Sequence, residues 1–334
     1  MERQVHNLIT HLLSMVAFVF ITNVGTCAEL DAETKSVITK AEQGQADAQF
    51  NLGMKSYFGE GVPQNYKEAV KWFRKAAEQG QESAQLFLGL VYAEGEGVPQ
   101  NHKEAVKWLR KAAERGQADA QFHLGRIHYE GEGVPQDYKE SANWWRKAAE
   151  QGYADAQNWL GGLYLEGKGV IKDDKESAKW YRKAAEQGHA DAQFHLAMTY
   201  EFGWGLPRDD KKAVKWYRKA AEQGYARAQF ELGARYYASK GVPKDNKESV
   251  KWFRKAAEQG HPFAQWQMGS KHDSGEGVPK DDVKAYAWFN VSSANGYEEA
   301  SASRNRIAKT MTPEQIAEAQ KLSREWFEKH QPKK

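Results

Sequence analysis

Apolar and polar positions recur along this chain with a period of 36 residues, and each period holds two patterned segments joined by a glycine-rich stretch. The later segment of the first period covers residues 66–78, with apolar residues at spacings of three and four: Ala69, Trp72, Phe73, Ala76 and Ala77. This spacing predicts an amphipathic helix that faces a core. Near-identical decapeptides, such as KWFRKAAEQG at 71–80 and 251–260, predict the same helix in every period.

The ends of this second helix carry recognisable signals. Asn65 is a natural N-cap with Glu68 three residues later, the arrangement of a capping box. Gly80 follows the last helical residue, where a left-handed backbone conformation is usually needed. The sequence therefore predicts a helix with defined boundaries at both ends.

The earlier segment of each period predicts a first helix with a recurring Ala48-Gln49 pair and a recurring Leu52-Gly53 pair. A glycine inside a helix costs roughly 1 kcal/mol relative to alanine. Its repetition predicts that a large side chain, an aromatic one from the second helix, packs against the glycine. The stretch GEGVPQN at 59–65 supplies glycine and proline for the turn between the two helices.

One tryptophan recurs in every period: Trp72, Trp108, Trp144, Trp180, Trp216, Trp252 and Trp288. A single helix pair is too small to bury a tryptophan, whereas stacked pairs can bury the same side chain at each interface. We interpret the column as a packing element. A stripe of tryptophans for stacking on a ligand is the alternative.

The chain divides into four parts on this basis. Residues 1–28 predict a signal peptide and residues 29–44 an N-terminal capping helix. Residues 45–296 hold seven repeats, and residues 297–334 form C-terminal capping helices and a basic tail. Thr312 and Pro313 predict the start of the last helix.

These motifs resemble the Sel-1-like repeat family, which is related to tetratricopeptide arrays. The resemblance rests on the Ala-Gln and Leu-Gly pairs, the Gly-x-Gly-Val-Pro turn, the tryptophan and the Ala-Ala-Glu-Gln-Gly close at 76–80. It implies an all-α fold, a right-handed α/α superhelical solenoid of seven 36-residue repeats, used as a scaffold for protein partners. Ile171 and Ser239 depart from the turn motif and put the local turn geometry in question.

Charge and composition narrow the function. Charged residues make up 28% of the chain with a net charge of +3, which predicts a solvated surface and no nucleic-acid site. The apolar stretch from Leu8 to Val24 predicts a secretory signal, with a periplasmic or secreted protein as the result. If that stretch stays uncleaved, the chain is instead an anchored assembly element at a membrane. Cys27 is the single cysteine.

Catalytic motifs are missing from the sequence. His123 and His128 are five residues apart, so their side chains diverge on a helix and do not form a zinc pair. We therefore expect a non-enzymatic protein without a metal or cofactor. The alternative is binding or hydrolysis of cell-wall or β-lactam ligands, as in cysteine-rich relatives, but this chain lacks their disulfides.

Three columns on one face of the first helices vary in chemistry between repeats. A face that packing leaves free can present individual contacts to a protein or peptide, on the concave side by analogy with related arrays. Neutral surface drift is the alternative. The predicted binding residues are Phe87, Leu90, His123, Arg126, Trp159, Glu166, His195, Met198, Phe202 and Glu231.

Overall fold

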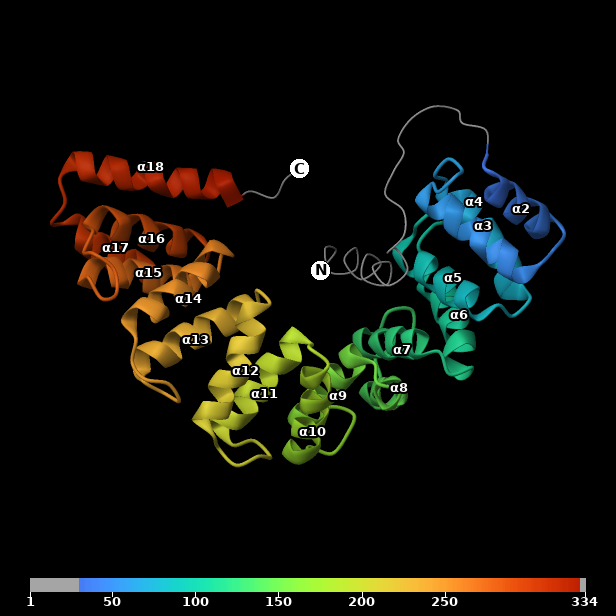
Figure 1. Cartoon of the computed structure of the whole chain (residues 1–334), viewed down its shortest axis with the longest axis horizontal. Helices are drawn as coiled ribbons and strands as arrows, with labels where there is room; N and C mark the ends of the chain where they lie inside the picture. Colours follow the sequence, from blue (N-terminus) through green and yellow to red (C-terminus); the bar gives the residue numbers. More distant parts are fainter. Residues whose placement is uncertain (1–29, 331–334) are drawn as a thin grey trace. The chain divides into compact units, whose positions relative to one another are not determined.

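The computed structural model describes residues 30–330, which contain helices and turns and no strand. The helices, labelled α2 to α18 in Figure 1, fall into two compact units that divide between Gln81 and Glu82. The predicted all-α class and the repeated helix-turn-helix pattern are confirmed. The predicted signal peptide and the Leu8–Val24 stretch lie outside the described residues.

The first unit holds three described helices: α2 (Ala32–Glu42), α3 (Ala46–Phe58) and α4 (Tyr66–Glu78). Helix α2 lies within the residues predicted to form the N-terminal capping helix, and Asp31 accepts a hydrogen bond from the backbone of Thr34 where it begins. Helices α3 and α4 form one repeat. A small core joins Ala41 of α2 to Ala48 and Leu52 of α3.

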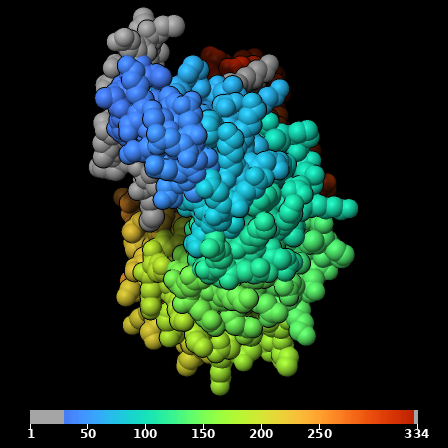
Figure 2. Space-filling view, turned by 90° about the vertical axis from the view of Figure 1, so that its right-hand side faces the viewer, coloured from blue at the N-terminus to red at the C-terminus, as the bar shows by residue number. Residues whose placement is uncertain are grey.

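The second unit continues the pattern, and its teal, green and yellow segments follow one another in sequence order in the space-filling view (Figure 2). Its first helices are α5 (Glu82–Glu94), α7 (Ala118–Glu130), α9 (Ala154–Glu166), α11 (Ala190–Phe202), α13 (Ala226–Ala238) and α15 (Pro262–Ser274). Its second helices are α6 (His102–Glu114), α8 (Tyr138–Glu150), α10 (Asp174–Glu186), α12 (Asp210–Glu222), α14 (Asn246–Glu258) and α16 (Asp282–Ala294). Helices α17 (Glu299–Ala308) and α18 (Pro313–His330) end the unit.

The predicted helix boundaries are confirmed, with one difference. Asn65 accepts a hydrogen bond from the backbone of Glu68 at 3.1 Å, and Gly80 has a φ of 88°. The Glu68 carboxylate does not return to the cap; it pairs with Lys71 at 2.9 Å. A complete capping box forms at Thr312, which exchanges hydrogen bonds with Gln315.

Six of the seven first helices carry this glycine, and α11 has Ala197 in its place. The glycine packs against an aromatic side chain as predicted, except Gly89, which meets Leu109. A Cβ added to Gly125 would lie 2.5 Å from the Trp145 ring, and one added to Gly161 would lie 2.9 Å from Tyr181. These large side chains form a column one residue after the tryptophans: Phe73, Leu109, Trp145, Tyr181, Tyr217, Phe253 and Phe289, all nearly or completely buried. The glycine therefore lets the two helices of a repeat approach closely.

The tryptophan column is less uniform than the sequence predicts. Trp108, Trp144, Trp180 and Trp252 are buried, whereas the other three are half-buried. A lysine three residues later lies over each of several rings; the Lys147 ammonium is 3.9 Å from the Trp144 ring centre. These tryptophans pack with one face and bind a cation with the other, so the deepest packing belongs to the next column.

Glutamines connect consecutive repeats. Gln121 Nε2 donates to the Ala113 carbonyl at 3.0 Å, and its Oε1 accepts from Gln151 at 2.8 Å. The same pair of bonds forms around Gln157, Gln193 and Gln229. Buried amides satisfied in this way fix the register between one second helix and the next first helix.

Candidate protein-binding surface

Large exposed hydrophobic side chains gather on the first helices of the second unit. Of the six in the described residues, four lie there: Trp159, Phe202, Tyr237 and Phe263. Tyr66 and Ile171 lie on a second helix and in a turn. We call the solvent-facing side of α5, α7, α9, α11, α13 and α15 the first-helix layer.

Trp159 on α9 is a half-embedded anchor. Its ring packs on Trp145, with centroids 5.2 Å apart, and on Tyr129, at 5.5 Å, yet the residue is 42% exposed. Packing on one side already restricts the ring to few rotamers. A partner that covers the other side therefore costs little additional side-chain entropy. A fixed, partly exposed tryptophan is typical of a binding hot spot.

Phe202 ends α11 and is 54% exposed. Its ring stacks on Trp204 in the following turn, with centroids 4.9 Å apart. Gly203 between them has a φ of 75°, which turns the chain back and brings the two rings together. The pair is a second apolar anchor on the first-helix layer.

Asp191 organises the polar part of this layer between α9, α11 and α13. It accepts hydrogen bonds from Asn158 at 2.8 Å and from Tyr225, and its carboxylate lies 3.6 Å from His195 Nε2. Burial alone raises the pKa of Asp191, but His195 and the two hydrogen bonds outweigh it and lower the pKa. His195 also stacks on Tyr181 at 4.8 Å, so this predicted binding residue is held in place and partly exposed.

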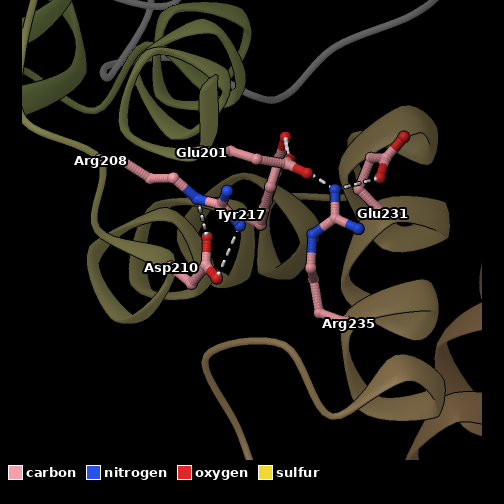
Figure 3. Close-up of polar contacts among 6 residues, drawn as sticks. All are labelled: Glu201, Arg208, Asp210, Tyr217, Glu231 and Arg235. Atoms are coloured by element: carbon pink, nitrogen blue, oxygen red, sulfur yellow. Dashed lines mark hydrogen bonds and ion pairs between the residues drawn. The ribbon is translucent and has the colours of Figure 1, made fainter. Parts of the chain in front are cut away.

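Arg235 links two carboxylates a repeat apart (Figure 3). It donates to Glu201 on α11 and to Glu231 on its own helix, the latter at 2.9 Å. Glu201 also accepts from the Tyr217 hydroxyl at 2.8 Å. The Arg235 side chain is only 11% exposed. The predicted binding residue Glu231 is thus part of a nearly buried ion pair, and burial raises its pKa.

Two predicted binding residues lie in the core. His123 is 3% exposed and Leu90 is 8% exposed, so neither side chain is available for direct contact with a partner. Burial lowers the pKa of His123 to about 3 and keeps the ring neutral. The variable columns therefore include buried core positions as well as exposed ones. Residue type alone does not distinguish the two.

The other predicted residues lie at intermediate depth or at the surface. Phe87, Arg126 and Met198 are half-buried, and Glu166 is exposed and pairs with Lys168 at 2.7 Å. Their role in binding stays a prediction. Among residues 30–330, no group of three or more His, Cys, Asp or Glu side chains could hold a metal ion. No helix in the same range is both long and apolar enough to cross a membrane.

Sequence reasoning missed the polar contacts between repeats. Asp191, Asn158 and Tyr225 look like three unrelated positions, because their residues are 33 and 34 apart. Their spacing nevertheless contains a signal. Residues 33 or 34 positions apart, slightly less than the 36-residue period, meet at interfaces between repeats. Arg235 and Glu201 share this offset of 34.

The repeats match a known protein family. A family model described as Sel1 repeat matches seven consecutive segments: 46–81, 82–117, 118–153, 154–189, 190–225, 226–261 and 262–297. The matched segments begin one residue later than the predicted repeats. No curated protein matches the chain.

Solved structures similar to this chain include two bacterial proteins. A Sel1 repeat protein from Oxalobacter formigenes is 35% identical, with a TM-score of 0.71, and the match covers 82% of this chain and 79% of that one. The protein c5321, described as a protective antigen present in uropathogenic Escherichia coli strains displaying an SLR fold, is 30% identical. That match covers 90% of this chain and 95% of the other, with a TM-score of 0.38.

Proposed function

The chain belongs to the Sel1 repeat family, whose repeats generally serve as scaffolds for protein–protein interaction, and we propose that it binds a protein or peptide through the first-helix layer. Sel1 repeat proteins are typically non-enzymatic, and we propose a scaffold role here too. The binding side would be the concave one.

The observation that carries this proposal is the position of the exposed aromatic side chains. Trp159 and Phe202 are held by packing against Trp145 and Trp204, yet each leaves a face open to solvent. Removing that apolar area from water is worth about 25 cal/mol per Å². Aromatic anchors fixed before binding lose little side-chain entropy on association, so they suit a preformed recognition surface.

We further propose that the protein acts outside the cytosol, in the periplasm or after secretion. The support is sequence alone: the Leu8–Val24 stretch has the length of a signal-peptide core, and small residues follow it at Thr26 and Ala28. Determination of the amino-terminal residue of the protein isolated from its source tests this. A terminus at Glu29 supports export with cleavage, and an intact Leu8–Val24 stretch supports the anchored form.

Affinity capture tests the binding surface. The protein is immobilised as the parent and as the Trp159→Ala/Phe202→Ala variant, and extract of the source organism is passed over both. The matched control is Tyr66→Ala/Ile171→Ala, which removes two exposed apolar side chains outside the first-helix layer. Circular dichroism confirms that each variant is still helical.

The proposal expects a protein retained by the parent and by the control, and lost from the first-helix variant. Equal retention by all three forms would place binding elsewhere, on the second helices or at the ends. Absence of any retained protein would contradict a scaffold for that extract and leave the exposed aromatics as surface drift.

A further inference from the structure

Opposite charges separate onto the two sets of helices over the first four repeats of the second unit, from α5 to α12. The first helices α5, α7, α9 and α11 carry eight acidic side chains and one basic one, Arg126. The second helices α6, α8, α10 and α12 carry sixteen basic and nine acidic side chains. The net charge of +3 for the whole chain hides this separation, because these two sets carry −7 and +7 and cancel.

We infer that the partner segment of this scaffold is cationic, with lysine or arginine flanking an apolar residue that covers Trp159 or Phe202. This inference rests on the proposed function, since it names the chemistry of the partner for the first-helix layer. Complementary charge steers association and selects among partners that share the same apolar residues.

The acidic groups lie at both ends of the first helices. Asp119, Asp155 and Asp191 occupy the first turns of α7, α9 and α11. Three glutamates occupy the last turns of α5, α7 and α9: Glu94, Glu130 and Glu166. Trp159 lies between these two rows. A segment lying along the layer would meet an apolar centre with acids on either side.

Two of these glutamates are not neutralised within the protein. Neither Glu94 nor Glu130 forms an ion pair with a basic group of the described residues, although Arg126 is near enough to lower both pKa values. Burial raises both pKa values, and the neighbouring Glu132 raises them further. Crowded carboxylates of this kind gain from a cationic side chain supplied by another molecule.

The lysines of the second helices are, in contrast, largely engaged within the protein. Lys107 and Lys179 pair with glutamates three residues earlier, at 3.4 and 2.9 Å. Lys111, Lys147 and Lys183 lie over tryptophan rings at 3.9 to 4.3 Å. Their charges are partly satisfied, so this layer favours no anionic partner as strongly as the first-helix layer favours a cationic one.

Selection from a random display library of peptides about 15 residues long tests the inference, because a segment of that length spans several repeats. The full protein is the immobilised target. Enriched peptides are then measured by fluorescence anisotropy against three proteins: the parent, Glu94→Gln/Glu130→Gln/Glu166→Gln, and Glu114→Gln/Glu150→Gln/Glu186→Gln. The last is the matched control, since it removes the same charge from exposed positions on second helices of the same repeats.

The inference expects enriched peptides with an excess of lysine and arginine around an aromatic or aliphatic residue. Binding should weaken about ten-fold in the first-helix triple variant and less than two-fold in the control, because close unscreened charges contribute most. Equal weakening in both variants would show a dependence on net charge alone and overturn it. An empty selection would overturn it too.

One outcome separates the scaffold function from the cationic partner. The enriched peptides then carry no excess of lysine and arginine, but their binding is lost in Trp159→Ala/Phe202→Ala. That result would leave the scaffold function in place and reject the cationic partner. Loss in neither the aromatic nor the glutamate variants would reject both.

Discussion

Two adjacent glycines in α9 predict opposite effects of the same substitution. A Cβ added to Gly161 would lie 2.9 to 3.1 Å from three atoms of the Tyr181 ring. A Cβ added to Gly162 would meet only the Tyr181 hydroxyl oxygen, at the ordinary contact distance of 3.6 Å. Gly161→Ala and Gly162→Ala therefore share one helix and one backbone and differ in packing.

The expected magnitudes follow from two competing terms. Alanine stabilises a helix interior by about 0.8 to 1.0 kcal/mol relative to glycine, and both variants gain this. Overpacking a well-filled core costs about 1 to 3 kcal/mol, and only Gly161→Ala meets this cost. Ala197 occupies the same column opposite Tyr217, so the ring can adjust in part, and we take the cost at Gly161 as about 2 kcal/mol.

We therefore expect Gly161→Ala to lower the free energy of unfolding by about 1 kcal/mol and Gly162→Ala to raise it by about 0.5 to 1 kcal/mol. Urea titration followed by circular dichroism measures both. Gly125→Ala should destabilise more than Gly161→Ala, because the added Cβ lies 2.5 Å from Trp145, and Trp145 is fixed by its hydrogen bond to the Phe122 carbonyl. A stabilising Gly161→Ala would refute the close approach of α9 and α10.

Four further substitutions test buried polar groups and the contacts they make. Arg235→Gln should lower the free energy of unfolding by about 3 kcal/mol, because it leaves the Glu201 carboxylate buried without its cation; urea titration measures it, and a change below about 1 kcal/mol would contradict the pairing. His123 has its pKa lowered by burial to about 3, so its neutral form is favoured in the fold, and its contribution is full above pH 6.5 and lost as the pH falls toward 3. That contribution to the free energy of unfolding falls by about 2 kcal/mol between pH 7 and pH 5. His123→Phe should remove this part of the pH dependence, which parallel urea titrations at the two pH values measure. The same pH dependence in both proteins would refute the burial of His123. Gln121→Ala should cost about 1 to 3 kcal/mol, because it removes a buried side chain together with its two hydrogen bonds, one to the Ala113 carbonyl and one from Gln151. Gln151→Ala keeps the bond to Ala113 and should cost less.

Much of the fold could be predicted from the sequence, because the same local patterns recur from repeat to repeat. The period of 36 residues, the caps at Asn65 and Gly80 and the glycine opposite an aromatic side chain are all local patterns, and the structure confirms them. The superhelical handedness and the four-part division of the chain stay predictions.

The depth of individual side chains was harder to predict. Periodicity assigns His123 and Trp159 to one column, yet one is 3% exposed and the other 42% exposed. The difference depends on the size of the neighbours in adjacent repeats, which no single helix pattern contains. The charge separation between the helix sets is present in the sequence, but it becomes visible only when charges are counted helix by helix.

Site-specific photo-crosslinking tests the central claim, that a partner binds the first-helix layer. A photoreactive phenylalanine replaces Phe202 on a first helix or Lys179 on a second helix; both side chains are about half exposed, at 54%. After irradiation in cells of the source organism, we predict a crosslinked protein adduct from position 202 and none from position 179. An adduct from position 179 without one from position 202 would contradict the claim.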